Sequence, residues 1–136
     1  MSGILVLLRT DGMPVERRLA QRLTDSLTLR GPDAQRIWCG GRVALGHALL
    51  RTTHESVHEH QPLSLDGHVW IVADGRVDAR RELVSALGDE TEAVLLRMPD
   101  VELMLRAYLR WGEACVEHRM KEPVEAFLVA CHHVGE

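Results

Sequence analysis

The sequence predicts an α+β domain, in which helices cover sheets formed by short strands. Two features of the chain support this prediction. Short apolar runs separated by glycine-containing turns dominate positions 36–73, whereas apolar residues recur every third or fourth position within 15–29 and 77–111. The resulting order of strand, helix, several strands, two helices and a last strand is typical of an α+β arrangement.

The first predicted element is a strand at 3–9, an uninterrupted apolar run that we expect to be buried on both faces. Residues 11–14, Asp-Gly-Met-Pro, then form a turn. A helix is predicted over 15–29, because apolar residues recur at every fourth position with charged residues between them. It ends at Arg30-Gly31-Pro32-Asp33, where glycine can adopt the left-handed cap conformation and proline blocks continuation.

Strands are predicted next at 36–39 and 42–50, joined by a Gly-Gly pair that is typical of a hairpin. Residues 51–62 are polar and rich in histidine, which indicates a loop. A second hairpin is predicted from 63–65 and 68–73, with Asp-Gly at its turn.

The last third of the chain contains two predicted helices, at 77–87 and 101–111. Leu83 and Leu87 mark the buried face of the first helix, and Trp-Gly ends the second. An apolar run at 124–130 predicts a final short strand.

Composition narrows the class of protein. The 136 residues suffice for one domain with one continuous core, and 46% of them are apolar. The net charge of -4, with no face of basic residues interleaved with aromatic ones, argues against nucleic-acid binding. The apolar runs are too short to cross a membrane, and we see no signal peptide. Cys39, Cys115 and Cys131 are expected to be reduced thiols, which predicts a cytoplasmic protein.

Histidine spacing raises the alternative of a metal site. His54, His58 and His60 lie close together in one loop, and three further donors near the C-terminus are Cys131, His132 and His133. One polar loop without a paired Cys-x-x-Cys motif is more often solvated than metal-bound. We therefore expect neither a metal ion nor any other cofactor.

Several short motifs occur in a fixed order from residue 2 to about residue 117. They are Met1-Ser2-Gly3-Ile4, Arg30-Gly31-Pro32-Asp33, Leu45-Gly46-His47, Gln61-Pro62, Asp74-Gly75-Arg76-Val77, Arg81-Glu82-Leu83, Pro99-Asp100-Val101-Glu102 and Trp111-Gly112-Glu113-Ala114. In this order they resemble the N-terminal, class II glutamine amidotransferase domain of the asparagine synthetase, β-lactam synthetase and lasso peptide cyclase family. The resemblance implies the αββα sandwich of N-terminal-nucleophile hydrolases.

The resemblance also assigns roles to the residues of the reaction centre. The family uses an N-terminal cysteine as nucleophile, its α-amino group as base, and an Asn-Gly pair as oxyanion hole. Ser2 stands at the cysteine position, Asp74 at the asparagine and Gly75 at the glycine. A serine depends more on its base than a cysteine does, and a carboxylate repels the developing negative charge.

Two further positions concern binding of the glutamine substrate. The arginine that holds the substrate carboxylate in the family is replaced by Leu49, although Arg51 lies two residues along the same strand and would face the same way. Asp100 matches the aspartate that binds the substrate amino group. An alternative interpretation is that Asp100 only caps the following helix, that Ser2 is only a small residue after Met1, and that Arg30-Gly31-Pro32-Asp33 is only a turn.

From these substitutions we expect a degenerate, non-catalytic glutamine amidotransferase domain. The first alternative is an active glutaminase, in which Ser2 attacks L-glutamine and the ammonia released feeds an amide-forming synthetase. The second is a small interaction module that pairs with a separate synthetase subunit, or with itself, through an edge strand.

The resemblance covers 1–117, and we expect 118–136 to be a divergent tail with the possible last strand. No Ser-Gly-Gly-x-Asp-Ser nucleotide loop is present, so ATP binding is not expected. Because the family continues with further strands and helices, the predicted domain is a C-terminally truncated version of the fold.

Overall fold

The structure is a computed structural model that describes residues 1–88, 91–118 and 132–133. Its elements follow one another in the order β1 (Gly3–Leu8), α1 (Arg17–Asp25), β2 (Ala34–Gly40), β3 (Val43–Leu49), η1 (Glu55–His58), β4 (Val69–Trp70), α2 (Arg80–Leu87), α3 (Glu92–Leu95), α4 (Asp100–Trp111), η2 (Gly112–Ala114), α5 (Cys115–His118) and β5 (His132–His133). The mixture of helices and strands confirms the predicted α+β class.

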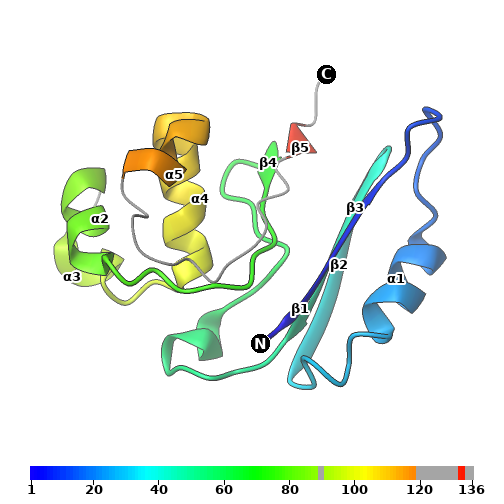
Figure 1. Cartoon of the computed structure of the whole chain (residues 1–136), viewed down its shortest axis with the longest axis horizontal. Helices are drawn as coiled ribbons and strands as arrows, with labels where there is room; N and C mark the ends of the chain where they lie inside the picture. Colours follow the sequence, from blue (N-terminus) through cyan, green and yellow to red (C-terminus); the bar gives the residue numbers. More distant parts are fainter. Residues whose placement is uncertain (89–90, 119–131, 134–136) are drawn as a thin grey trace.

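Strands β1, β3 and β2 form an antiparallel sheet with β3 at its centre. Its three strands agree closely in position with those predicted at 3–9, 36–39 and 42–50. The expectation that the first strand is buried on both faces was wrong: within the described residues β1 is an edge strand, most of it is only half-buried, and Leu8 is exposed. One face of this sheet is covered by α1, and the other faces β4 and the remaining helices (Figure 1). All seven residues of β3 are buried, because this strand lies between two strands and between two layers.

Close packing of α1 on the sheet depends on a glycine in β3. A Cβ atom at Gly46 would lie 2.1 Å from the hydroxyl oxygen of Thr24 on α1. Thr24 is fully buried, and its hydroxyl donates to the Ala20 carbonyl, so the helix carries a polar side chain into this contact without losing a hydrogen bond.

Helix α1 is shorter than the helix predicted over 15–29. It begins at Arg17 and ends at Asp25, and the following residues form single turns. The Ser26 hydroxyl donates to the Leu23 carbonyl and the Thr28 hydroxyl to the Asp25 carbonyl. Such side-chain bonds compete with continued helical pairing, which explains the early end of the helix.

The second sheet is small, and its pairing matches the predicted hairpin of 63–65 and 68–73 only in part. Leu63 and Ile71 exchange two backbone hydrogen bonds as an isolated bridge, while β4 pairs with β5. The sequence pattern predicts no element at His132–His133, which form β5. The strand predicted at 124–130 lies outside the described residues.

Apolar side chains join the two sheets. Val43 and Leu45 of β3 pack with Val72, which lies shortly after β4. The rings of Trp38 on β2 and Trp70 on β4 stack with centroids 4.7 Å apart. This contact fixes the position of the segment that continues from β4 into residues 71–77.

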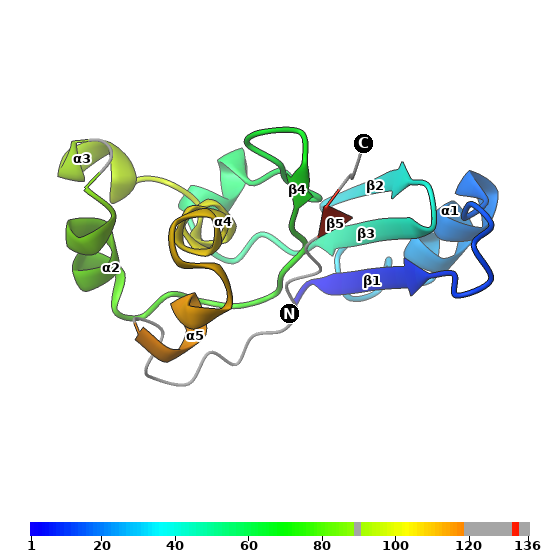
Figure 2. The same cartoon turned by 90° about the horizontal axis from the view of Figure 1, so that it is seen from above.

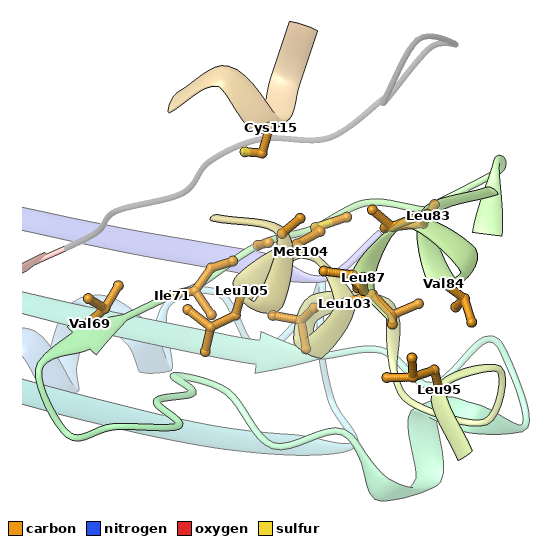
Figure 3. Close-up of a cluster of buried hydrophobic side chains, with 14 residues drawn as sticks. Val69, Ile71, Leu83, Val84, Leu87, Leu95, Leu103, Met104, Leu105 and Cys115 are labelled. Atoms are coloured by element: carbon orange, nitrogen blue, oxygen red, sulfur yellow. The ribbon is translucent and has the colours of Figure 1, made fainter. Parts of the chain in front are cut away.

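The largest core cluster lies between that segment and the helices α2 and α4 (Figure 3). Ile71, Leu83, Leu87 and Leu103 are almost completely buried there. Helix α4 closely matches the prediction of 101–111, but α2 begins at Arg80 rather than at residue 77. The chain is not yet helical at Val77, whose backbone N–H donates to the Asp100 carboxylate.

The layers therefore run from α1 through the three-stranded sheet and the β4 layer to α2 and α4, as the view in Figure 2 also shows. Among the described residues, no helix has both the length and the apolar character needed to cross a bilayer.

Candidate functional site

A cavity of about 100 Å³ lies at the end of β3, where the N-terminus, the η1 segment, the residues after β4 and the start of α4 meet. Four of the predicted site residues line it together: Ser2, Asp74, Gly75 and Asp100. The fold thus brings together positions that are up to 98 residues apart in the sequence.

Ser2 is held by two hydrogen bonds. Its hydroxyl oxygen accepts from the Leu50 backbone N–H at 2.9 Å. Its backbone nitrogen donates to Oδ1 of Asp74 at 3.2 Å. The Ser2 side chain therefore ties the start of β1 to the end of β3, a structural role that is independent of catalysis.

The Arg30-Gly31-Pro32-Asp33 motif holds the same end of β3. The Asp33 N–H donates to the Leu49 carbonyl at 3.0 Å, and the Asp33 carboxylate accepts from the Arg51 N–H at 2.7 Å. A Cβ atom at Gly31 would lie 1.8 Å from the Ala48 carbonyl oxygen, so only glycine fits this close approach. The motif acts as more than a turn, because it positions the strand end that lines the cavity.

Asp74 and Gly75 are positioned by Gln61. Gln61 is only 3% exposed. Its side-chain amide forms two hydrogen bonds with the backbone of Ala73, at 2.7 Å and 3.0 Å. The residue just before Asp74 is therefore fixed by a buried amide. In the sequence, Gln61 was visible only as part of a Gln-Pro motif, and nothing in the motif indicated its partner.

Asp100 is the first residue of α4, and both of its carboxylate oxygens are in use. Oδ2 accepts from the Val77 N–H at 3.2 Å, and Oδ1 pairs with the Arg80 guanidinium at 2.5 Å. The cap position is Pro99, which makes no side-chain cap hydrogen bond. The N-cap interpretation of Asp100 was therefore wrong.

Arg80 belongs to this site although no sequence motif pointed to it. Besides Asp100, its guanidinium donates to the carbonyls of Leu96, at 2.8 Å and 3.0 Å, and of Met98. It thus closes the turn between α3 and α4. The sequence placed Arg80 within a predicted helix but did not indicate that it would contact these groups.

The cavity is rich in negative charge. Its lining includes four carboxylates, those of Glu55, Glu59, Asp74 and Asp100. Burial raises the pKa of Glu59, and the nearby Asp100 and Asp74 raise it further. Burial also raises the pKa of Asp100 against the opposing effects of the Val77 N–H and Arg80. Glu55 and Glu59 were not predicted, since the loop that carries them has no periodic pattern.

Two arginines line the cavity beside these carboxylates. The Arg80 guanidinium is already bonded to the Asp100 carboxylate and to the main-chain carbonyls of the turn before α4. The Arg76 side chain is 79% exposed and pairs with Asp78 at 3.1 Å. Neither guanidinium is available as an unpaired cation inside the cavity.

Leu49 and Arg51 lie elsewhere. Both line a neighbouring cavity of about 70 Å³, which agrees with the prediction that their side chains face the same way. Neither lines the cavity of Ser2. Glu59 and Gln61 line both cavities and stand between them. The predicted role of Arg51 in substrate binding stays a prediction.

No three metal-binding side chains come together within residues 1–88, 91–118 and 132–133. His54, His58 and His60 form no such group, and Cys131 lies outside the described residues. Cys39 is half-buried and Cys115 is buried, and both are free thiols.

Comparison with known proteins identifies the family to which the chain belongs. A model of the glutamine amidotransferase domain matches residues 1–122. The chain belongs to this family of glutamine amidotransferase domains. The expected resemblance is thereby confirmed, and its match extends a few residues past the boundary predicted at 117.

A curated relative is the glutamine-hydrolysing asparagine synthetase 3 of Bacillus subtilis (strain 168), which is 32% identical over 109 residues. The match covers 76% of this chain and 17% of the relative, so the chain spans about a sixth of that protein's length. The chain is thus a glutamine amidotransferase domain related to asparagine synthetase.

Proposed function

We propose that this glutamine amidotransferase domain is degenerate and non-catalytic, and that it serves as a structural partner of an amide-forming synthetase. The observation that carries this proposal is the Asp74 carboxylate, 3.2 Å from the Ser2 nitrogen and in the position of the oxyanion hole. Three requirements of glutamine hydrolysis fail around it.

The first requirement is a free base. In a chain from which Met1 has been removed, the Ser2 nitrogen becomes an α-amino group beside Asp74. An α-amino group normally has a pKa of about 8, and an opposite charge within hydrogen-bond distance raises that pKa. The amine is then held as an ammonium ion, which cannot accept the proton of the Ser2 hydroxyl.

The second requirement is stabilisation of the oxyanion. Attack on an amide carbon places negative charge on its oxygen, and a working site directs N–H donors at that oxygen. Here Asp74 presents a carboxylate, and Glu59 and Asp100 line the same small cavity. The loss of one oxyanion donor costs about 10²–10³ in rate, and a negative charge in its place opposes the reaction further.

The third requirement is a cation for the carboxylate of glutamine. The family position holds Leu49, which lies in the neighbouring cavity. Arg80 is already bonded to Asp100 and to main-chain carbonyls, and Arg76 extends outward to Asp78. Binding glutamine here would leave its carboxylate close to Asp74 and Glu59 without a partner of opposite charge.

The partner is inferred from the family and from the sheet. The relative is a much longer protein named as a synthetase, of which this chain matches only a part. The layer order of helix, two sheets and helices supports an αββα sandwich of the N-terminal-nucleophile hydrolase type. Within the described residues, β1 is an edge of the three-stranded sheet, and an apolar edge strand is suited to pairing with another chain. We expect this association to occur in the cytoplasm.

The test is ammonia release from L-glutamine, measured with a coupled glutamate dehydrogenase assay. The sample must have Ser2 as its first residue, as checked by mass spectrometry of the intact chain. We expect no ammonia above the level of the matched Ser2→Ala variant. Release that Ser2→Ala abolishes would contradict the proposal and establish the rival function, an active serine glutaminase, which is favoured by the grouping of Ser2, Gly75 and Asp100 in one cavity.

The structural role needs its own measurement. Sedimentation velocity of the chain alone and with a candidate synthetase domain distinguishes a monomer, a homo-oligomer and a complex between the two proteins. We expect the complex. Self-association alone would favour the interaction-module alternative, in which the chain pairs with a second copy.

A further inference from the structure

The smaller cavity beside the site lies at the polar end of the sheet face that meets β4. Arg36 on β2 is the direct cross-strand neighbour of His47 on β3. Both residues line the cavity of about 70 Å³, together with Arg51 and His60. Two arginines and two histidines thus surround one small space at the rim of the sheet.

Three of these side chains lack partners in the part of the chain that the structure describes. His47 is 2% exposed, and its Nε2 atom is buried without a hydrogen bond. The guanidinium groups of Arg36 and Arg51 form no hydrogen bond or ion pair with any described residue. A buried polar atom without a hydrogen-bond partner costs about 1–3 kcal/mol of stability. An unpaired histidine beside two unpaired arginines is therefore expected where a bound ligand supplies the missing hydrogen-bond partner.

We propose that this cavity binds a small oxyanion, a phosphate or carboxylate group, held by Arg36 and Arg51 with His47 as a further donor. A guanidinium presents paired N–H groups that match two oxygens of such an anion. A neutral imidazole carries one N–H, which can complete the set. The proposal does not depend on the absence of glutaminase activity, because none of these three side chains lines the cavity of Ser2.

Glu59 is the one carboxylate in the lining of this cavity. Its oxygen accepts a hydrogen bond from the Gln61 side chain at 2.5 Å. Gln61 in turn is bonded to Ala73, which places this pair on the side that faces the Ser2 cavity. The Glu59 carboxylate is thus already hydrogen-bonded within its own segment, whereas the proposed contacts to the anion come from β2, β3 and the residues after β3.

The experiment uses inorganic phosphate as the probe, with sodium acetate as the carboxylate arm, each titrated against sodium chloride at equal ionic strength. The thermal midpoint of unfolding is expected to rise and to saturate, because a ligand that binds only the folded chain stabilises it. Arg36→Gln and Arg51→Gln should each weaken the apparent affinity about tenfold, as expected for loss of a charge-assisted hydrogen bond. The double variant should lose the saturable rise.

Arg18→Gln is the matched control. Arg18 is an exposed arginine of α1, on the other side of the sheet, and its removal changes the net charge equally. The control should keep the full response, which separates a site from the general stabilising effect of phosphate on folded proteins. The ring ¹H–¹⁵N resonances of His47 should also shift during the titration.

Equal responses in Arg18→Gln and the two cavity variants would overturn the proposal, as would the absence of saturation in the unmodified chain. A response to acetate but not phosphate would identify the group as a carboxylate, and the reverse would identify it as a phosphate. Because Arg36 and Arg51 are exposed, loss of folding is not expected to obscure these comparisons.

Discussion

The backbone nitrogen of Ser2 donates to the carboxylate of Asp74 at 3.2 Å. This contact joins the start of β1 to the segment after β4, two parts of the chain separated by 72 positions. In the proposed function the same pair occupies the nucleophile and oxyanion positions of the family. Once Met1 is removed, the proposal expects this contact to favour a positively charged amine where catalysis needs an unprotonated one.

In the Met1-free chain, Asp74→Asn is expected to lower the pKa of the N-terminal amine, because the neighbouring negative charge is removed. The measurement is the pH dependence of ¹³C chemical shifts after reductive dimethylation of the amine. Asp78→Asn removes a nearby carboxylate that pairs instead with Arg76, and it should leave the amine unchanged. An equal effect of both variants would contradict a specific contact between Ser2 and Asp74.

Ser2→Cys alone is expected to release no ammonia from glutamine. A thiol is the better nucleophile, but under the proposed function Asp74 still opposes the oxyanion and Leu49 still leaves the substrate carboxylate without its arginine. The coupled ammonia assay checks this expectation on a Met1-free chain whose first residue is the introduced cysteine. Activity in this single variant would show that the nucleophile was the only missing part.

Gly31→Ala is expected to lower the free energy of unfolding by about 3 kcal/mol or more, since the added Cβ atom would lie 1.8 Å from the Ala48 carbonyl oxygen in the central strand. Urea unfolding measures the change. Gly41→Ala is the control: it has free space around it and a φ of 56°, so only the cost of about 1 kcal/mol for a left-handed alanine applies. Similar losses in both variants would argue against the close approach at Gly31.

Asp100→Ala is expected to cost about 2 kcal/mol of stability, because it removes the partner of a charged group and the acceptor of the Val77 N–H. The matched control is Glu102→Ala on the same helix, whose i,i+4 pair with Arg106 should contribute about 0.5 kcal/mol. Both changes are read from urea unfolding. A loss at Asp100 no larger than that at Glu102 would mean that Asp100 is not a structural residue.

Acid is expected to destabilise the fold through His47. Burial lowers the pKa of His47 from 6.5 to about 4. Between these two values the unfolded chain binds a proton that the folded chain does not, so the free energy of unfolding falls as the pH falls, by up to about 3 kcal/mol. Urea unfolding from pH 7 to pH 4 measures the slope.

The comparison for this prediction is His47→Gln, which cannot titrate in that range. Glu59 and Asp100 have raised pKa values, which act in the opposite direction in both proteins, so the difference between the two slopes isolates His47. Identical slopes would show that His47 does not remain neutral in the folded chain.

Local patterns in the sequence identified the strands of the first sheet, because apolar runs of that length have few other ways to bury themselves. The helix at 101–111 was predicted for the same reason, from its period of three to four residues. Motif order was also sufficient for the family, and it gathered Ser2, Asp74, Gly75 and Asp100 as one set, which the fold places around one cavity.

Pairings between distant segments could not be predicted in this way. β4 pairs with β5, and Arg80 reaches Asp100 and the carbonyls before it. Such contacts depend on which surfaces meet when the layers pack. The type of a residue does not indicate which distant residue it will contact.

The sequence by itself determined the α+β class, the family and the chemical identity of each site residue. Only the tertiary structure decided the partners of those residues: that the Asp74 carboxylate holds the Ser2 nitrogen, that both oxygens of Asp100 are occupied, and that Leu49 and Arg51 face a separate cavity. The physical reason is that residue type sets the charge and hydrogen-bonding capacity of a group, whereas its pKa and its availability to a substrate are set by neighbours that packing brings from elsewhere in the chain.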